Sequence, residues 1–558
     1  MNIKGMNKFL LVLIALAVVF FIIYSAFYVS VTLPLANQAE GHYIFSWPDA
    51  MANNYFIKQF ALTNDFIKTE PLNVELNNVI HPRSTNVTFD GNIVPVSFLG
   101  MLIIYGWLTK FIGSYLIMFL TPLLASAMVL FFYGLIRRVF NDLIGFISAL
   151  LLFGLASFWY YANLVMLPTI LFIFLVISGL YFLIRIGDQV EYKYKYGFSI
   201  LSGLLLSFAV ITRLTEAIWI AIIVLVCFIF YRKKVELSQV LIFLVAGLVP
   251  LAILLIYNEQ TYGSYFTIGY LNLSSGGAIM DRMPPELQVS GGMKIVTYLK
   301  LIFAPFGFYE KTILWNFGKY FVEFLLPYVV LCFVGGIVWL INAFKKQVTK
   351  NQVCFAVCSF LISVWLVLYY GSWEFVDLLV LENNTVGSSY VRYWLPLNIL
   401  ILPLIAYLLA ESLKLKVYKW LKITLITVVI ISLTTYSALI VYDSPGDGLV
   451  AQKKVIESYY VRAEKVNSFI ENDSVIITDR ADKLFFPRHQ VAVFDLDYTV
   501  FSRLQTAINY KPIYYLTLRP ETDINYINEK KIKSLNLQLN KFKQIDEQFN
   551  LYKLVSLD

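Results

Sequence analysis

The sequence predicts a polytopic α-helical membrane protein with about eleven transmembrane helices and a small C-terminal α/β soluble domain. Three observations predict this fold class. Hydrophobic residues make up 59% of the 558 residues and charged residues only 14%, whereas about a quarter of the residues in soluble domains are charged. Apolar runs of about eighteen residues or more recur along the chain, and each can cross roughly 30 Å of hydrocarbon. Beyond residue 442, short apolar runs alternate with amphipathic stretches instead.

The positive charges predict the topology of the spans. The net charge is +8, and the lysines and arginines lie in short clusters between apolar runs. This is the positive-inside pattern of a membrane protein and not the basic patch of a nucleic-acid-binding protein. Lys4 and Lys8 precede the first run, so we predict a cytoplasmic N-terminus. The predicted spans lie near residues 9–31, 115–136, 143–160, 167–184, 198–214, 216–231, 237–257, 320–343, 353–371, 394–412 and 423–442.

One apolar segment, residues 94–112, does not fit this alternation. A full span there would move the Arg137-Arg138 pair to the outer side, against the positive-inside pattern. We therefore expect a juxtamembrane or re-entrant helix packed against the protein, which is allowed where the backbone is shielded from lipid. The first run, by contrast, is too long for a signal-peptide core and lacks a small-residue cleavage site, so we expect an uncleaved anchor.

This topology leaves three outer loops and predicts two domains. The loops lie near residues 32–93, 258–319 and 372–393. The domains are a membrane module at residues 1–442 and an extracytoplasmic α/β domain at residues 443–558. The N-x-S/T sequons all fall on the predicted outer side, although Asn, Ser and Thr favour loops in any case. These sequons are Asn86, Asn272, Asn383 and Asn472.

The sequence of the tail predicts strands separated by helical segments, and this pattern favours a small α/β domain. The segments are Val475–Thr478, Val491–Phe494, Pro512–Leu518, Ile524–Leu535 and Phe549–Leu557. Asp479, Asp495 and Asp497 lie at strand ends. Carboxylates in such places usually cap the backbone or face solvent, so we do not expect them to be catalytic.

The first outer loop carries the most informative carboxylate, Asp49. It follows Pro48 among aromatic residues, soon after the first helix. A partly desolvated carboxylate beside the membrane can act as a general base or a metal ligand. The alternative is an N-cap for the helix expected next, a position that an Asp often fills.

Four cationic or donor side chains are candidates for binding a phosphate group. His81 and Arg83 lie in the first loop, where the alternative for Arg83 is a solvated charge or a headgroup contact. Arg213 lies with Glu216 at the end of a hairpin between two spans, and charges at membrane depth are functional candidates. Their alternative is a mutual ion pair at i, i+3. Arg392 begins a late helix in the string Arg392-Tyr393-Trp394-Leu395-Pro396.

Aromatic and sulfur side chains have two interpretations. Tyr270 and Tyr393 lie near the membrane interface, where aromatic residues suit both carbohydrate stacking and the ordinary interfacial belt. The four cysteines all fall in apolar runs, which indicates apolar helix packing. They show neither a zinc spacing nor a disulfide framework. These cysteines are Cys227, Cys332, Cys354 and Cys358.

The order of three motifs along residues 8–442 resembles the GT-C superfamily of membrane glycosyltransferases. The most similar group is that of the dolichyl-phosphate-mannose protein mannosyltransferases and lipid A aminoarabinose transferases. The motifs are Asp49 with His81-Pro82-Arg83 and Asp90-Gly91…Val94-Pro95, then Asn258…Tyr262-Gly263-Ser264…Gly269-Tyr270, then Arg392-Tyr393-x-Leu395-Pro396.

The resemblance implies a polyprenyl-phosphate sugar as donor and an active site on the extracytoplasmic face. It implies that Asp49 deprotonates the acceptor hydroxyl in a single-base inverting transfer. We expect the donor phosphate to be bound by Arg83, Arg213, Arg392 and His81. We expect Tyr270, Tyr393 and Glu216 to line the substrate. The acceptor is left open among protein, lipid and polysaccharide.

The chain also departs from the pattern of this family. Family members often have paired acids at this place, whereas Asp49 is followed by Ala50. Many members also have an acid in the loop before the fourth or fifth span, whereas the stretch 161–168 here has no carboxylate. A divalent metal therefore stays open, as does a catalytically inactive relative. A transporter or flippase of lipid-linked sugars is the other alternative, although we find no internal repeat of the kind that transporters show. An oligosaccharyltransferase would carry a larger soluble domain and a Trp-Trp-Asp string, which does not occur.

Overall fold

The computed structural model describes residues 8–188, 191–270, 305–374, 385–416, 418–494 and 497–557. Among them, ten helices are long and apolar enough to cross a membrane, and the number rises to eleven if one bent pair counts as a single span. The predicted number of about eleven is confirmed. By contacts, the chain falls into unit 1 (residues 1–27, 118–253 and 284–452) and unit 2 (28–117, 254–283 and 453–558). The predicted domain boundary at residue 442 stays a prediction.

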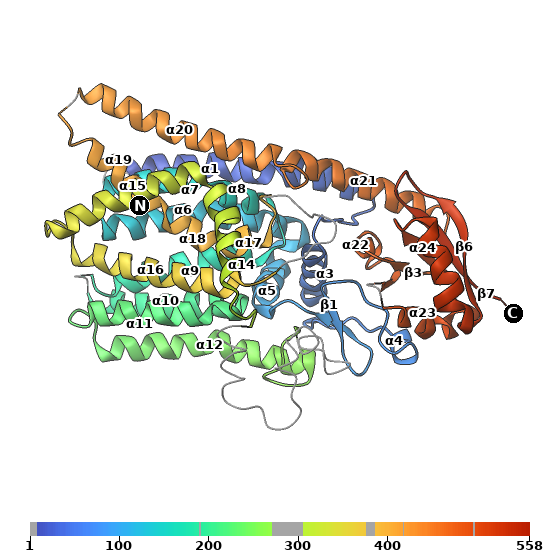
Figure 1. The fold of residues 1–558 in the computed structure, drawn as a ribbon. Coiled ribbons are helices and arrows are strands. Elements are labelled where there is room, and N and C mark those ends of the chain that lie inside the picture. The colour runs from blue at the N-terminus through green and yellow to red at the C-terminus, as the bar shows by residue number, and fades with distance from the viewer. Residues whose placement is uncertain are drawn as a thin grey trace. The chain divides into compact units, whose positions relative to one another are not determined.

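Unit 1 is built from long helices that run side by side, as Figure 1 shows for α9, α10 and α11. The helices of unit 1 include at least one for each predicted span. In chain order they are α1 (Lys8–Phe27), α6 (Leu120–Val139), α7 (Asp142–Phe153), α8 (Ala156–Asn163), α9 (Pro168–Arg185), α10 (Tyr192–Thr212), α11 (Ala217–Tyr231), α12 (Leu237–Tyr262, which runs on into unit 2), α14 (Glu310–Phe317), α15 (Leu326–Phe344), α16 (Lys350–Gly371), α17 (Ser389–Tyr393), α18 (Leu395–Leu400), α19 (Leu402–Ser412) and α20 (Lys419–Asp443).

The span predicted at residues 143–160 is not straight. α7 and α8 meet at a bend of 54°. Gly154 ends α7, and Leu155 has an extended backbone with φ −73° and ψ 123°. A Cβ on Gly154 would lie 2.6 Å from Oγ1 of Thr434. The glycine therefore lets α20 approach the bend closely, and apolar composition alone does not reveal this.

The segment predicted at residues 94–112 begins as a strand rather than a helix. β2 (Ile93–Pro95) pairs with β1 (Thr85–Val87), and α5 runs over Leu99–Leu116 with a kink at Gly113, where φ is +81°. A short turn then leads into α6. Taken together, the 41 residues from Leu99 to Val139 are long and apolar enough to cross a membrane. Its juxtamembrane or re-entrant placement stays a prediction.

Unit 2 contains a five-stranded sheet in the order β4-β3-β5-β7-β6. β3 (Val475–Thr478) is parallel to β4 (Gln490–Val493) and β5 (Ile513–Thr517), while β7 (Asn550–Ser556) is antiparallel to β5 and to β6 (Leu537–Gln544). Its helices are α21 (Leu449–Asn467, whose first turn belongs to unit 1), α22 (Asp482–Phe485), α23 (Thr499–Leu504) and α24 (Glu521–Tyr526). The small C-terminal α/β fold is therefore confirmed.

The first loop completes the core of this sheet. It supplies the helices α2 (Leu33–Gln38), α3 (Pro48–Thr63) and α4 (Leu72–Glu75) to unit 2. Leu76, Val79 and Ile80 belong to the same buried apolar cluster as the strand residues of the tail. Ile80 also forms an isolated bridge with Ala492 in the edge strand β4. Two segments about 400 residues apart in the sequence thus fold as one unit.

Candidate active site

A buried ion pair lies where α10 gives way to α11 in unit 1. α10 ends at Thr212, and the next backbone position is extended (φ −147°, ψ 87°) before a short turn leads into α11. This break turns Arg213 and Glu216 inward, with Nη2 of Arg213 3.0 Å from Oε1 of Glu216. Their side chains are 7% and 1% exposed. The ion pair predicted as the alternative is therefore present.

Two further side chains satisfy the Glu216 carboxylate. The hydroxyl of Tyr370 donates to Oε1 over 2.7 Å, and Nε1 of Trp219 donates to Oε2. The carboxylate thus has a donor on each oxygen besides the guanidinium, as a buried charge requires. Sequence reasoning missed Tyr370 and Trp219, although a Tyr-Tyr-Gly string at the end of the span predicted at 353–371 is a polar signal there.

Arg213 retains donor capacity despite its partner. Its buried Nη2 lies 3.0 Å from the Glu216 carboxylate but forms no hydrogen bond to any described residue. A buried guanidinium donor without a hydrogen bond is costly unless a ligand completes it. Phosphate oxygens match the planar fork of a guanidinium.

Two arginines converge on one aromatic ring. The Cζ atom of Arg213 lies 4.7 Å from the ring centre of Tyr393, and that of Arg392 lies 5.0 Å from it. Nη2 of Arg392 also donates to the Tyr393 hydroxyl over 3.2 Å. The ring is held in turn by Tyr370, on which it stacks with centres 4.6 Å apart and an interplanar angle of 6°. Two cations beside a polar aromatic edge suit an anionic ligand.

Asp49 lies in unit 2, in the first turn of α3. The N-cap of this helix is Trp47, so Asp49 is not the cap that was the alternative for it. The half-buried carboxylate accepts a hydrogen bond from the hydroxyl of Ser84 over 2.6 Å.

Arg83 and His81 hold the first loop against the tail. Nε of Arg83 donates to Asp482 over 2.7 Å, and Nη2 donates to the carbonyl of Arg480 over 2.6 Å. His81 is partly buried beside β4, and desolvation of its imidazole lowers the pKa of that ring. A largely buried carboxylate thus balances the Arg83 charge, in contrast to the solvated loop charge that was the alternative.

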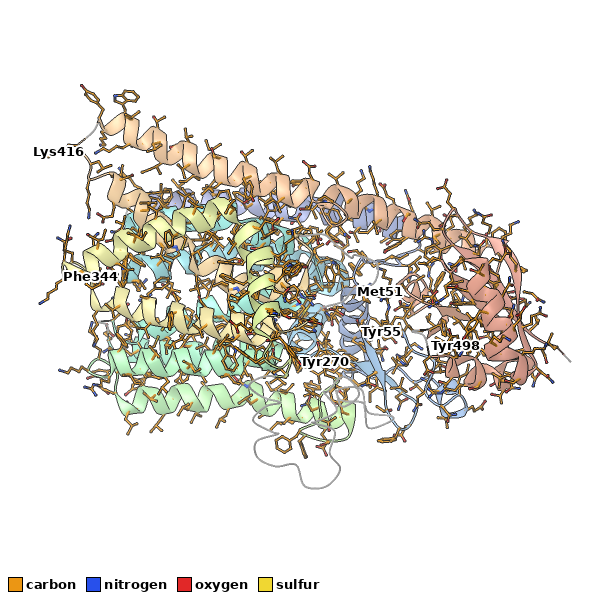
Figure 2. All side chains as sticks on the ribbon, in the orientation of Figure 1. Met51, Tyr55, Tyr270, Phe344, Lys416 and Tyr498 are labelled. Atoms are coloured by element: carbon orange, nitrogen blue, oxygen red, sulfur yellow. The ribbon has the colours of Figure 1, made fainter. Side chains whose placement is uncertain are left out.

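The Gly269-Tyr270 string packs on the first loop within unit 2. A Cβ on Gly269 would lie 2.2 Å from the carbonyl oxygen of Pro95, so only glycine fits. Asn86 donates to the Gly269 carbonyl over 2.9 Å, which occupies the amide of that sequon. Tyr270, labelled in Figure 2, contacts Phe98 with ring centres 5.0 Å apart. Two motifs of the resemblance therefore lie together.

Two of the three tail acids at predicted strand ends, Asp479 and Asp497, have structural partners. Asp479 accepts hydrogen bonds from Tyr515 and Arg519, each over 3.0 Å. Asp497 accepts from the backbone and hydroxyl of Thr499. Asp495 and the sequons at Asn272 and Asn383 lie outside the described residues. Among the described residues, Asp49 belongs to no grouping of three side chains that could ligate a metal.

Comparison with solved structures identifies the fold. No protein-family model matches the sequence, and no curated protein matches it significantly. The apo structure of ArnT from Cupriavidus metallidurans superposes with a TM-score of 0.52 at 10% identity, covering 97% of each chain. The same protein bound to undecaprenyl phosphate gives a TM-score of 0.53 at 11% identity and the same coverage. This chain has the fold of ArnT. The oligosaccharyltransferase of Archaeoglobus fulgidus is also similar, with a TM-score of 0.44 at 11% identity over 89% of this chain and 69% of that one.

The fold implied by the resemblance of the three motifs is therefore confirmed. The structural likeness extends over nearly the whole chain, the C-terminal sheet included, whereas the motifs covered residues 8–442 only.

Proposed function

We propose that this protein transfers a sugar from a polyprenyl-phosphate-linked donor to an acceptor hydroxyl on the extracytoplasmic face of the membrane. One observation carries the proposal. A protein whose structure contains undecaprenyl phosphate shares the GT-C fold with this chain over 97% of both. A donor with a polyprenyl tail is confined to the bilayer, and a polytopic fold gives the enzyme access to it.

Asp49 is the proposed general base. Its carboxylate takes the proton from the acceptor hydroxyl as the acceptor oxygen attacks the anomeric carbon of the sugar. The bond between that carbon and the phosphate oxygen breaks, and polyprenyl phosphate leaves with the bonding electrons. One displacement inverts the anomeric configuration and requires a single base. The hydrogen bond from Ser84 orients the carboxylate.

Arg213 and Arg392 are the proposed ligands of the donor phosphate. Negative charge grows on this phosphate as the sugar leaves, and fixed cations lower the barrier most where charge develops. The buried Nη2 of Arg213 without a hydrogen bond and the position of both guanidiniums around Tyr393 support this assignment. Glu216 and Tyr393 then position the arginines, and Tyr270 is proposed to line the substrate.

The proposal leaves Arg83 and His81 out of phosphate binding. The donors of Arg83 are engaged by Asp482 and the Arg480 carbonyl, and His81 is held against β4. It also assigns no step to a divalent metal, because Asp49 lacks neighbouring ligands of a suitable kind among the described residues.

Donor turnover tests the proposal directly. Purified wild-type protein is mixed with a panel of polyprenyl-phosphate hexoses and pentoses and with membrane acceptors, and the released polyprenyl phosphate is quantified. We expect Asp49→Asn to lower the rate by roughly 10²–10⁴-fold, the usual contribution of a general base. Asp473→Asn, at a carboxylate that is 82% exposed, is the matched control and should leave the rate unchanged. Equal release by Asp49→Asn and wild type would remove Asp49 as the base.

One observation favours the transporter alternative. The bent pair α7–α8 is a broken helix, and broken helices form the binding sites of many transporters. Protein reconstituted in liposomes separates the two functions. Movement of a labelled lipid-linked sugar between leaflets without its cleavage would favour transport, whereas release of polyprenyl phosphate would favour transfer.

A further inference from the structure

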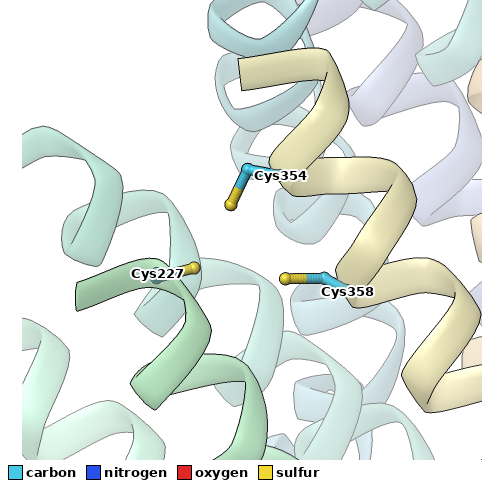
Figure 3. A group of neighbouring side chains, drawn as sticks. All are labelled: Cys227, Cys354 and Cys358. Atoms are coloured by element: carbon cyan, nitrogen blue, oxygen red, sulfur yellow. The ribbon is translucent and has the colours of Figure 1, made fainter. Parts of the chain in front are cut away.

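Three cysteines meet between two helices of unit 1. Cys227 lies on α11, and Cys354 and Cys358 lie one turn apart on α16. Figure 3 shows the three side chains directed into the space between these helices. Their sulfur atoms all lie within 4.8 Å of one another. The residues are 6%, 5% and 8% exposed. Sequence reasoning gave them only a packing role, because the grouping joins residues far apart in the chain.

The helix pair that carries the cysteines is fixed at both ends. Near the cysteines, the hydroxyl of Tyr231 donates to Oδ1 of Asn351 over 3.1 Å. At the other end, Tyr370 donates to Glu216. Hydrogen bonds at both ends keep the two helices in a fixed relative position. The three sulfurs between them therefore form a preorganised cluster. From Cys358 to Tyr370 the helix rises about 18 Å, so the cluster is separate from the arginine site.

We propose that Cys227, Cys354 and Cys358 form a binding site for one Cu(I) ion. Metal–sulfur bonds of about 2.3 Å place the three sulfurs of a trigonal site roughly 4 Å apart. The observed spacing therefore needs only a small contraction. Soft thiolate ligands select Cu(I), zinc and iron–sulfur clusters, and the number of ligands decides among them. The inference does not depend on the proposed transferase activity.

The number of ligands argues against zinc. Structural Zn²⁺ is almost always bound by four ligands in a tetrahedron. Within the described chain, this grouping holds three cysteines and no histidine or carboxylate. Cu(I) is satisfied by three sulfurs or fewer, which matches the cluster.

Cu(I) titration of the full-length protein in detergent, under anaerobic conditions and against a chromophoric Cu(I) chelator, tests the site. We expect one Cu(I) per wild-type chain. Loss of even an outer-shell partner costs roughly 10–100-fold in metal affinity, so Cys227→Ser and Cys358→Ser should each weaken binding by at least about 100-fold. Cys332→Ser is the matched control, because this fourth cysteine lies on α15 outside the cluster, and it should bind as wild type does.

Four results would overturn the proposal. One is a wild-type chain that binds no Cu(I) although size-exclusion chromatography shows it folded and monodisperse. Another is unchanged Cu(I) affinity in folded Cys227→Ser, Cys354→Ser and Cys358→Ser proteins. The third is a count of two free thiols in the denatured, unreduced wild type that rises to three in Cys227→Ser, which would identify a disulfide instead. Displacement of Cu(I) by equimolar Zn²⁺ would contradict the choice of ion.

Discussion

The guanidinium of Arg83, in the first loop, forms an ion pair of 2.6 Å with the carboxylate of Asp482, in the C-terminal domain. The Asp482 side chain is 1% exposed, and the backbone N–H of Arg83 donates to the same carboxylate over 2.9 Å. A charge buried this deeply depends on its partner. The pair therefore fastens the loop that carries Asp49 to the sheet, and the C-terminal domain stabilises the proposed base indirectly.

Replacing Arg83 should destabilise unit 2 rather than weaken donor binding. Arg83→Ala leaves Asp482 buried without its cation, which costs about 3 kcal/mol in such settings. Limited proteolysis of the full chain in increasing urea reports the free energy of unfolding. The exposed pair of Lys541 and Glu521 gives the control, since Lys541→Ala should cost well below about 1 kcal/mol. A raised KM for the donor with an unchanged free energy of unfolding would show instead that Arg83 binds the donor phosphate.

Removing the Tyr370 hydroxyl should destabilise unit 1. Tyr370→Phe deletes a donor to the buried Glu216 carboxylate, and hydrogen bonds to charged groups contribute about 1.5–3 kcal/mol. Unfolding of the detergent-solubilised protein, followed by circular dichroism, measures the loss. Tyr369→Phe is the matched control, because the adjacent hydroxyl makes no hydrogen bond to a described residue and should cost under about 0.5 kcal/mol. Equal losses in both variants would show that the hydrogen bond contributes nothing specific.

Much of the fold could be predicted because it depends on local composition. A span requires length and apolarity, and both are visible in a single stretch. The strand Val475–Thr478 was predicted with its observed bounds because all four residues are apolar or β-branched and all are buried. β6 was missed because most of its residues are exposed and polar, so its sequence shows no buried face.

The candidate site depends on contacts that no local pattern records. The sequence named the Arg213–Glu216 pair and the Arg392-Tyr393 string as separate candidates, and the structure brings these four residues together. The partners of Arg83 lie 399 and 397 positions away. Only tertiary structure distinguishes this arginine, which donates hydrogen bonds to Asp482 and to the Arg480 carbonyl, from Arg213, whose Nη2 forms an ion pair but no hydrogen bond.

Replacing Arg392 should slow transfer and weaken product binding together. Arg392→Gln removes one cation beside the proposed phosphate, and loss of one such stabilising group costs roughly 10²–10³-fold in kcat. Arg392→Lys keeps the charge but loses the planar fork, so its rate should lie between those of wild type and Arg392→Gln. Turnover and inhibition by free polyprenyl phosphate are measured on the same proteins. Arg488→Gln, at a guanidinium that donates to the Ala39 carbonyl, should leave both unchanged. Slower turnover with unaltered product inhibition would place the phosphate elsewhere.

His42 should make unit 2 less stable in mild acid. Burial lowers the pKa of its imidazole from 6.5 to about 4, and the nearby Arg488 and Lys58 act in the same direction against its hydrogen bond to the Leu484 carbonyl. The folded state therefore favours the neutral ring, and between these two pKa values the unfolded state binds more protons. The contribution is complete above pH 6.5 and is lost as the pH falls towards 4.

This loss is of the order of 3 kcal/mol at most. His42→Gln keeps a donor for the Leu484 carbonyl but does not titrate. Limited proteolysis of both proteins in urea at pH 7.5, 5.5 and 4.5 measures the difference between them, in which the effects of other titrating groups cancel. The stability of wild type relative to His42→Gln should fall steadily as the pH drops from 6.5 to 4.5. A difference independent of pH would show that the ring titrates alike in both states.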